Sequence, residues 1–482
     1  MSESKLRTTD IANGIRFREL MRDRVLYDPD TDIWFLWDTR RWMRVSGRSD
    51  ARVRELAKEV VFTIDDEVAR EQNESIRDSL RDWAKQSQSS ARISAMLSAA
   101  KAERELWVSA SEFDTIPYLL NATNGTVDLR TSTLSPADPK QKITRLVPYP
   151  YEPQEKAPRF EALLNRMVAC DATGRTGAFM RKAIGYSMLG RNPEQVAFLI
   201  EGETNTGKSQ VLETVAAVLG SEYATSTIKP EVIAKSQYGP HTTALDKLAG
   251  KHFTAITEAA QGLDVDEYAI KSLTGSGSAS MRALWSNERD VPVTWTLFVA
   301  VNEDSVNIER WEPAIARRLI VIKSGPTVPV EERILGLKEH IVENEARGVL
   351  AVLIRGAREY HQDLAAMSKV FTLEHVPAAV RNAMLEAERR YDHVAAFVRD
   401  WCEFDENAYT PTSDVSAKYH SLRPNAPKKG PGTLSSQALF RRIESVAKGM
   451  GHGNVRRDGR YLVGLRLRES SLSDHFNLAY GV

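Results

Sequence analysis

The sequence predicts an α/β protein in which one parallel sheet is flanked by helical regions. Three observations predict this fold class. Short β-branched runs alternate with helical segments over residues 194–325. A glycine-rich G-x-x-x-x-G-K-S motif stands between one such run and the helix that follows it. Segments rich in Ala, Glu, Arg and Lys with helical spacing fill residues 50–105 and 330–400.

Composition excludes several classes of protein. The chain has 482 residues, of which 27% are charged and 42% hydrophobic, as in soluble globular proteins. Lys+Arg and Asp+Glu are both 65, which excludes a wholly basic nucleic-acid coat but permits a local basic patch. Two cysteines cannot form a disulfide framework. No apolar run approaches the roughly 18 residues of a membrane helix, and residues 1–10 lack the apolar core of a secretory signal. We therefore expect a cytoplasmic protein that does not enter a membrane.

Two parts are expected before the sheet. Residues 1–108 should form an N-terminal α/β and helical region, because a tryptophan-rich hairpin pattern at 33–45 precedes helical spacing without Pro or Gly. Residues 109–190 carry an Asn-Gly hairpin signal, a proline-rich linker and further helical spacing. The three rings of the first hairpin are either core side chains or a base-stacking platform: Trp34, Trp37 and Trp42.

Two further parts are expected after the sheet region, which we place at residues 191–325. Residues 326–405 predict a helical segment, and residues 406–482 predict a helix followed by a hairpin at Asp458-Gly459. Alternation beyond this turn places four apolar side chains on one face of a strand: Tyr461, Val463, Leu465 and Leu467. Residues 411–482 hold twelve Lys or Arg against five Asp or Glu, so the neutral total conceals a basic end.

The strongest motif lies in VAFLIEGETNTGKSQVLETVAAVLG at 196–220. A short apolar strand enters the motif and an amphipathic helix leaves it, which is the context that a phosphate loop requires. Gly202 and Gly207 let the backbone curl so that successive N–H groups point at phosphate oxygens, and the helix N-terminus adds its positive end. Lys208 should reach the β and γ phosphates, and Ser209 should offer its hydroxyl to Mg²⁺. The residues expected to bind ATP are Gly202, Glu203, Thr204, Asn205, Thr206, Gly207, Lys208, Ser209 and Gln210.

An acidic residue is expected to complete the site. About fifty residues downstream of the loop, a buried-strand pattern at 252–257 ends in Glu258. We expect Glu258 to polarise the attacking water and, with Ser209, to bind the metal; the alternative is a solvated loop residue. A second acidic residue is absent, because Thr257 precedes Glu258 and Ala259 follows it.

Two later strands add an amide and a cation. Asn302 ends the next apolar strand, where it can hydrogen-bond the γ-phosphate or the attacking water, or simply cap the strand. Arg317 and Arg318 precede another apolar strand. Paired arginines at such a place are either a solvated edge or, in a ring ATPase, an arginine finger for the neighbour's nucleotide. We prefer Arg318 as the finger and Arg317 second.

The order of these motifs resembles a known family. GETNTGKS, Glu258, IKSLTGSGSASMRALW at 270–285, VAVN and IARRLIVI follow one another as in the superfamily 3 helicases of the AAA+ group. More closely, the chain is similar to the C-terminal helicase part of phage and plasmid primases, related to the poxvirus primase-helicase. Residues 109–153 and 184–202 are similar to the domain that precedes the helicase, and the tail is similar to the family's winged-helix end. The resemblance implies an AAA+ P-loop ATPase core, a helical segment after it and a C-terminal winged-helix domain.

The resemblance also implies DNA contacts. Lys271 and Arg282 match the motif after the acidic strand, which in the family includes a hairpin pointing into the channel of a hexamer. Arg282, Trp285 and Arg289 would then approach single-stranded DNA, although Trp285 could instead be core. The helix and the hairpin of the tail suit binding to duplex DNA. The alternative is a solvated basic surface. The arginines concerned are Arg441, Arg442, Arg456, Arg457 and Arg460.

The sequence thus predicts an ATP-dependent DNA helicase with ATP and Mg²⁺ as cofactors. It would form a homo-oligomer, a hexameric ring, on single-stranded and forked DNA during replication of a phage, plasmid or mobile element. No segment has primase features, so any primase is expected to be a separate chain or absent. One alternative is a ring ATPase that melts an origin or remodels nucleoprotein without processive unwinding. The other is a DNA-tethering module with a regulatory ATP site.

Overall fold

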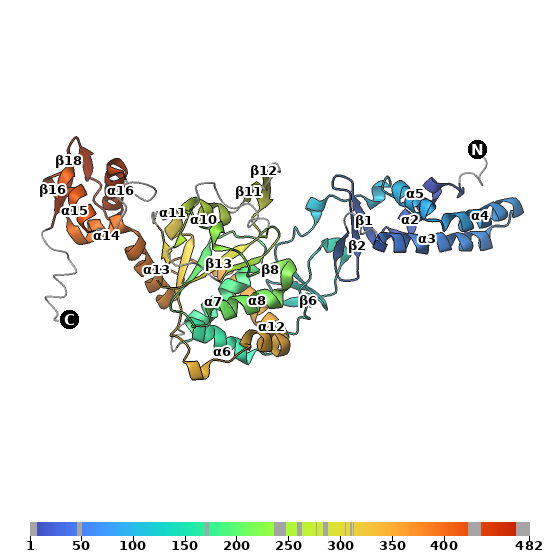
Figure 1. Cartoon of the computed structure of the whole chain (residues 1–482), viewed down its shortest axis with the longest axis horizontal. Coiled ribbons are helices and arrows are strands. Elements are labelled where there is room, and N and C mark those ends of the chain that lie inside the picture. Colours follow the sequence, from blue (N-terminus) through green and yellow to red (C-terminus); the bar gives the residue numbers. More distant parts are fainter. Residues whose placement is uncertain are drawn as a thin grey trace.

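The computed structural model describes residues 7–45, 51–168, 173–235, 247–257, 263–275, 277–282, 288–303, 305–308, 311, 313–422 and 435–468. For residues 278–282, 288–290, 307 and 393 it describes the backbone alone. Figure 1 shows a central body that contains the large sheet, with the N-terminal elements on one side and the C-terminal elements on the other. Within the described residues, no helix combines the length and the apolar character that crossing a membrane requires.

The N-terminal elements surround their own hydrophobic cluster. An antiparallel sheet of three strands packs with α2, α3 and α5, and α4 packs against α3 in a smaller cluster. Helices α3, α4 and α5 confirm the helices expected at 50–105. Trp34 and Trp42 are only 5% and 3% exposed, so both are core side chains, while Trp37 is half-buried. The elements are α2 (Asp10–Met21), β1 (Val25–Asp28), β2 (Ile33–Trp37), β3 (Trp42–Val45), α3 (Ala51–Arg70), α4 (Glu74–Ser87) and α5 (Ser90–Ala100).

A second small antiparallel sheet precedes the central one. Its first turn contains the Asn-Gly pair, so the hairpin expected there is confirmed. Two helices then lead to the large sheet. The elements are η1 (Arg104–Leu106), η2 (Ala110–Glu112), β4 (Leu119–Ala122), β5 (Gly125–Asp128), β6 (Thr133–Ser135), η3 (Pro139–Gln141), α6 (Pro158–Met167) and α7 (Arg175–Ser187).

The central sheet has five strands in the order β15-β7-β13-β9-β8, and all neighbouring pairs are parallel. This confirms the parallel sheet that the sequence predicts. Its inner strands are buried along their whole length, which explains why they read as continuous apolar runs. The strands are β7 (Ala197–Glu201), β8 (Ala224–Thr225), β9 (Phe253–Ile256), β13 (Thr296–Val301) and β15 (Leu319–Lys323).

Helices and short strands surround this sheet. The hairpin of β11 and β12 lies beside α10 at the top of the view in Figure 1. The large hydrophobic cluster joins the sheet to α6, α7, α8, α12 and α13. The elements are α8 (Lys208–Tyr223), η4 (Pro230–Val232), β10 (Leu263–Asp264), α10 (Glu267–Leu273), β11 (Ser278–Arg282), β12 (Glu288–Pro292), β14 (Val306–Asn307), α11 (Pro313–Ala316), η5 (Val330–Glu332), α12 (Leu337–Ala366) and α13 (Ala378–Tyr391).

The C-terminal elements form a third cluster, in which α16 is followed by the hairpin expected at Asp458-Gly459. The expected alternation along its second strand is wrong in part. Leu462 is fully buried whereas Tyr461 is largely exposed. Gly464 adopts a positive φ of 84°, and the paired strand changes register between Phe404 and Tyr409, so strict alternation is lost. The elements are α14 (His393–Trp401), β16 (Cys402–Pro411), α15 (Thr412–Ser421), α16 (Ser436–Gly449), β17 (Arg456–Asp458) and β18 (Tyr461–Leu467).

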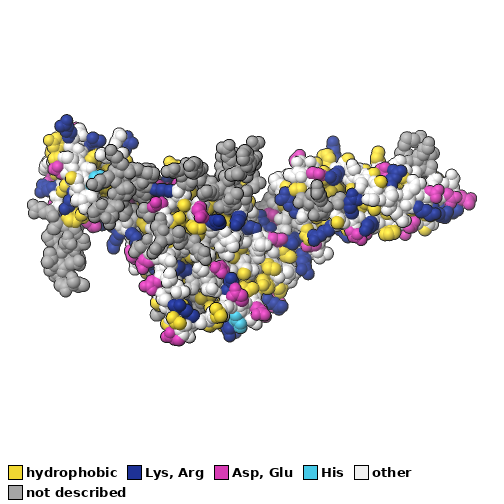
Figure 2. Space-filling view, viewed as in Figure 1, with side chains coloured by type: hydrophobic (Ala, Val, Ile, Leu, Met, Phe, Trp, Pro, Cys, Tyr) yellow, Lys and Arg dark blue, Asp and Glu magenta, His cyan; other side chains and the backbone are white. Residues whose placement is uncertain are grey.

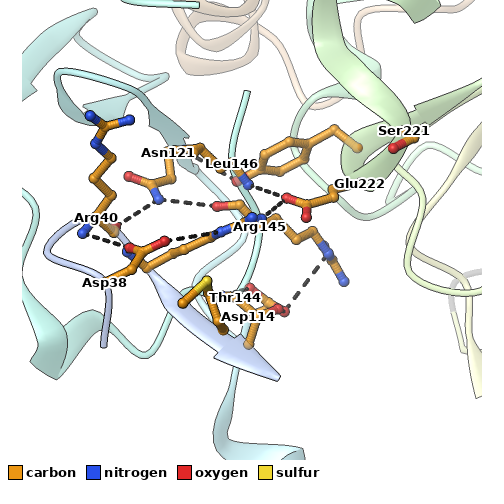
Figure 3. Close-up of polar contacts among 12 residues, drawn as sticks. Asp38, Arg40, Asp114, Asn121, Thr144, Arg145, Leu146, Ser221 and Glu222 are labelled. Carbon is orange, nitrogen blue, oxygen red and sulfur yellow. Dashed lines mark hydrogen bonds and ion pairs between the residues drawn. The ribbon is translucent and has the colours of Figure 1, made fainter. Parts of the chain in front are cut away.

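A polar junction joins the N-terminal elements to the end of α8 (Figure 3). The Glu222 carboxylate pairs with Arg41 and accepts the N–H of Leu146 at 2.8 Å. Next to it, the Tyr223 hydroxyl accepts the N–H of Asn121 at 3.2 Å. The far end of the helix that begins at Lys208 is therefore held by residues from before the sheet.

Candidate functional site

The glycine-rich loop lies between β7 and α8, at the carboxyl edge of the parallel sheet. Gly202 follows β7, and a Cβ at this position would lie 2.0 Å from the Ser324 hydroxyl, so only glycine fits. Gly207 precedes α8 with a positive φ of 94°, which favours glycine. The loop therefore has the close approach and the left-handed turn that a curled anion-binding backbone needs.

Lys208 is the first residue of α8 and is buried. Its ammonium donates to the carbonyl oxygens of Gly202, at 2.9 Å, and of Glu203. It also donates to Thr206 Oγ1 at 3.3 Å. Burial lowers the pKa of the Lys208 ammonium, and the carboxylate of Glu203 opposes this shift. A buried cation held only by neutral oxygens has unused capacity to attract an anion.

Three strand ends converge on the same place. Ser209 Oγ donates to the carbonyl oxygen of Thr257, at 3.1 Å, directly after β9. Asn302 follows β13. A cavity of about 370 Å³ lies between these strand ends and the loop. Its lining residues are Thr204, Asn205, Thr206, Gly207, Lys208, Ser209, Gln210, Thr257, Ala300 and Asn302.

The lining holds residue types that the expected ATP and Mg²⁺ would need. A glycine-rich loop before a helix N-terminus and one ammonium are groups that attract phosphate oxygens. A hydroxyl at Ser209 is a hard oxygen ligand of the kind that Mg²⁺ prefers. The expected acidic residue, Glu258, lies outside the described residues, although Thr257 before it lines the cavity.

A segment that could not be predicted from the sequence holds the loop from outside. Thr327 Oγ1 donates to Glu203 Oε2 at 2.7 Å and contacts the Thr204 carbonyl oxygen at 2.9 Å. The Val328 N–H donates to the Asn205 carbonyl oxygen at 2.9 Å. We call residues 324–328 the strap. No motif in the sequence marks it, because its contacts depend only on the chain leaving β15 beside β7.

A charged network lies under the loop. Glu201, at the end of β7, is buried, pairs with Arg390 of α13 and lies 3.2 Å from Lys323 Nζ. Lys323 also pairs with Glu303 at 3.0 Å, and Arg390 with Glu386 at 3.2 Å. Hydrogen bonds and charge from Glu303 and Glu201 outweigh burial and raise the pKa of Lys323. These pairs tie the strand before the loop to the neighbouring strand and to α13.

Arg317 and Arg318 lie at the other edge of the sheet, before β15. Arg318 is half-buried and donates to Gln195 Oε1 at 2.9 Å and to the Ala314 carbonyl oxygen at 3.2 Å. Burial and then the charge of Arg317 lower its pKa. Arg317 is exposed. The five residues of β15 span roughly 16 Å, so Arg318 does not reach the loop of its own chain.

The expected DNA-contacting residues fall into two regions. Lys271, on α10, is half-buried, with its ammonium 5.7 Å from the ring centroid of the exposed Tyr268. Trp285 lies outside the described residues. Only the backbone of Arg282 and Arg289 is described. Arg282 lies on β11 and Arg289 on the paired strand β12.

In the C-terminal elements, four of the five expected arginines are exposed: Arg441, Arg456, Arg457 and Arg460. Figure 2 shows Lys and Arg side chains over this part of the molecule. Arg442 differs from them. Its guanidinium pairs with the buried Asp392 and donates to the Trp311 carbonyl oxygen at 3.2 Å. Its position thus joins α16 to the sheet region instead of pointing to solvent.

Comparisons with known proteins concern the part before the loop and the overall fold. Residues 14–169 match a family model described as D5 N terminal like. No curated protein sequence matches the chain significantly. An apo structure of the NrS-1 C-terminal region aligns with 94% of this chain and 99% of that chain, at 12% identity and a TM-score of 0.44. An A-form apo structure of that region aligns with 71% and 68%, at 13% identity and a TM-score of 0.39. The family match supports, over residues 14–169, the resemblance to phage-type primase-helicases.

Proposed function

We propose that this chain is an ATP-dependent DNA helicase that acts as a hexameric ring during replication of a phage, plasmid or mobile element. One observation carries the proposal. Residues of the glycine-rich loop, Lys208, Ser209 and Asn302 all line one cavity at the carboxyl edge of a parallel sheet. The family match before the loop supports the replication setting.

Each residue then has a role. Lys208 neutralises the β and γ phosphates, and Ser209 would hold Mg²⁺, which when bound would supply charge stabilisation to the transferred phosphoryl group. Glu258 orients and polarises the attacking water and contributes to the metal site. Asn302 donates its amide to the γ-phosphate or to that water. Arg318, with Arg317 second, acts on the nucleotide of the neighbouring subunit.

The same proposal assigns the DNA contacts. Lys271, Arg282, Trp285 and Arg289 follow a single strand near the hairpin of β11 and β12, by phosphate pairing and base stacking. The exposed arginines of the C-terminal elements bind duplex DNA in a winged-helix arrangement. Any primase partner is a separate chain.

The test is strand displacement of a forked DNA in the presence of ATP and Mg²⁺, measured beside ATP hydrolysis with and without single strands. Lys208→Ala should abolish both activities, because it removes the phosphate cation. Lys58→Ala, an exposed lysine on α3, is the matched control and should keep both.

Two other outcomes of these assays would favour the two alternative functions. ATP hydrolysis without strand displacement on any fork would favour a ring that melts an origin or remodels nucleoprotein. Wild-type protein that binds nucleotide but neither hydrolyses it nor unwinds DNA would contradict the helicase and leave a tethering module with a regulatory ATP site.

A further inference from the structure

The end of α13 connects two distant parts of the molecule. Arg390 pairs with Glu201, the last residue of β7, directly before the glycine-rich loop. Asp392, the residue after α13, pairs with Arg442 of α16 in the C-terminal elements. We call residues 390–392 the junction. A contact beside the proposed nucleotide site and a contact with the proposed DNA-binding elements are thus two residues apart in the chain.

Asp392 separates two helices. Its backbone N–H donates to the Glu388 carbonyl oxygen at 2.8 Å and ends α13, while its Oδ1 accepts the Ala395 N–H at 2.9 Å and begins α14. Its φ of −86° and ψ of 71° lie outside the helical region. The hydrophobic clusters divide at the same place, since Tyr391 belongs to the large cluster of the sheet region and Val394 to the cluster of the C-terminal elements. A bend at Asp392 therefore leaves both clusters intact.

Arg442 holds the C-terminal elements against the sheet region at this break. Its guanidinium pairs with the Asp392 carboxylate and donates to the Trp311 carbonyl oxygen at 3.2 Å. The ring of Trp311 stacks on that of Tyr391, with centroids 5.4 Å apart. The side chain of Arg442 is 24% exposed and that of Asp392 is 6% exposed, so solvent reaches the pair from the arginine. An anion that arrives from solvent can therefore compete with Asp392 for Arg442.

Duplex DNA is an anion that meets this requirement. Arg441 lies next to Arg442 on α16, is exposed and forms no ion pair with any described residue. A duplex carries one negative charge per roughly 1.7 Å of its axis, so a duplex bound at Arg441 brings phosphates close to Arg442. Arginine pairs with phosphate through two parallel hydrogen bonds, as it does with a carboxylate. Phosphate can thus replace the partner that Arg442 has in this structure.

The other end of the junction contributes to the charge beside the glycine-rich loop. Glu201 is 1% exposed and is followed by Gly202, whose carbonyl oxygen accepts the Lys208 ammonium at 2.9 Å. Arg390 and Lys323, which lies 3.2 Å from Glu201, together neutralise this carboxylate. If Arg390 moves away, Glu201 retains less compensation for its buried charge, and a carboxylate directly before the loop repels phosphate groups.

We propose that binding of duplex DNA to the C-terminal elements lowers the affinity of the nucleotide site through the junction. This inference rests on the proposed function, which supplies both ligands. A phosphate takes Arg442 from Asp392, the chain bends at Asp392, and Arg390 moves away from Glu201. The form in which both ion pairs are closed, as in this structure, binds nucleotide more tightly. Engagement of duplex thus promotes release of nucleotide, and by linkage nucleotide weakens duplex binding by the same factor.

The first experiment measures the Kd of a non-hydrolysable fluorescent ATP analogue with Mg²⁺ in the full chain, without duplex DNA and with saturating duplex. In the wild type, duplex should raise this Kd by at least about fivefold, the lower end of typical coupling between two sites. In the reverse titration, saturating analogue should raise the Kd of a labelled duplex by the same factor. Duplex that leaves the nucleotide Kd of the wild type unchanged, or lowers it, overturns the inference.

Arg442→Gln and Asp392→Asn test the route. Each removes the ion pair, and asparagine at position 392 still caps α14, because its side-chain oxygen accepts the same backbone N–H. Each variant should bind nucleotide with the weaker Kd that the wild type shows with duplex, so the ratio of Kd values with and without duplex should fall to about one. The double variant should match the single variants, since all three lack the same pair. A variant that keeps the wild-type ratio overturns the inference.

Arg441→Gln is the matched control on the same helix. It removes a proposed phosphate contact but leaves the pair of Arg442 and Asp392, so at saturating duplex it should keep the wild-type ratio. Loss of the ratio in this control as well would mean that the duplex contact, and not the junction, carries the effect, and would overturn the inference. A wild type that binds no nucleotide or no duplex contradicts the proposed function, whereas one that binds both without mutual effect overturns the inference alone.

Discussion

At the scale of single residues, His252 makes stability depend on pH. Its ring is buried at the start of β9, where Nδ1 lies 3.0 Å from the Met188 carbonyl oxygen and Nε2 contacts Arg145. Burial, reinforced by the charge of Arg145, lowers the pKa of His252 to about 3. In the unfolded chain the ring titrates near its ordinary value of about 6.5. Between these two values the unfolded state binds more protons, so stability is complete above pH 6.5 and is lost as the pH falls.

We therefore expect the free energy of unfolding of the wild type to fall between pH 6.5 and pH 5. The contribution of one such group is at most about 1.4 kcal/mol per pH unit. His252→Asn should reduce this slope, whatever its overall stability, and urea unfolding at several pH values measures it. His420→Asn, at an exposed position of α15, is the control. An unchanged slope in His252→Asn would contradict the assignment.

Asn302 should act on the chemical step more than on binding. Its amide lines the cavity beyond Lys208 and Ser209, at the end of β13. Removal of one hydrogen-bond donor from a site of developing charge costs roughly 10²–10³ in kcat. Asn302→Ala should therefore lower the kcat of ATP hydrolysis by about 10²-fold while KM changes by less than about fivefold.

The neighbouring Glu303→Gln is the control for this measurement. Glu303 is exposed, and its carboxylate pairs with Lys323 instead of lining the cavity. Its kcat should remain within a few-fold of wild type. An Asn302→Ala enzyme whose KM rises steeply at unchanged kcat would assign the amide to ground-state binding.

The placement of Lys208, Ser209 and Asn302 could be predicted because each follows a strand of one parallel sheet. Carboxyl ends of parallel strands meet at one edge, so these side chains come together although the strands lie far apart in sequence. Thr327 could not be predicted in this way. Its partners are 123 and 124 residues away, and a threonine in a proline-containing loop carries no motif.

At the scale of elements, the strap is expected to stabilise the curled form of the loop. Thr327→Val keeps the shape of the side chain and removes its hydroxyl contacts with Glu203 and Thr204. A net hydrogen bond contributes about 0.5–1.5 kcal/mol, which corresponds to roughly a 2- to 12-fold loss of nucleotide affinity. Titration with a fluorescent ATP analogue measures this change. Thr327→Ser, which retains the hydroxyl, should bind like wild type, and equal losses in both variants would exclude the hydrogen bonds as the cause.

The network of Glu201 should stabilise the connection between β7 and α13. Glu201→Gln removes the buried charge and leaves Arg390 and Lys323 with their outer partners Glu386 and Glu303. Removing one partner of a fully buried ion pair costs about 3–5 kcal/mol, and the outer partners should reduce this to about 2–3 kcal/mol. Thermal unfolding should show a lower Tm than for Glu303→Gln, which removes an exposed partner. A Tm equal to that of Glu303→Gln would mean that the buried carboxylate adds nothing to the outer pairs.

Whether the burial pattern of a strand could be predicted from the sequence depended on the neighbouring elements that cover or pair with it. The buried strands β7 and β13 read correctly from continuous apolar runs, since both faces are covered. β18 did not, because Gly464 and the irregular partner strand β16 break the period of two on which the prediction rested. Such an interruption depends on the partner strand, which one segment of sequence does not reveal.

At the scale of the whole molecule, the three largest hydrophobic clusters of the described residues lie in the N-terminal, central and C-terminal parts of the chain. The contacts that join the parts of the chain include polar pairs between distant residues, such as Arg41 with Glu222 and Arg442 with Asp392. Surface arginines look alike in sequence, so Arg442 was expected to contact DNA together with Arg441. Only the neighbourhood of the buried Asp392 distinguishes the two.

Basic side chains are concentrated near the C-terminal end of the chain. Residues 411–482 have an excess of seven basic over acidic side chains in a chain whose total charge is zero. If the C-terminal elements bind duplex DNA, each phosphate contact contributes about 0.9 to the slope of log K against log salt concentration. Arg456→Gln combined with Arg460→Gln should therefore lower the slope by up to about 1.8 and weaken binding uniformly across sequences.

Fluorescence anisotropy of a labelled duplex at several salt concentrations measures this slope. Arg81→Gln, on the exposed face of α4 among the N-terminal elements, changes the net charge without removing a contact of the C-terminal elements. Because long-range attraction is screened beyond about 10 Å at 0.1 M salt, this control should leave the slope unchanged. A double variant with the wild-type slope would place the duplex elsewhere on the molecule and make the basic end a solvated surface.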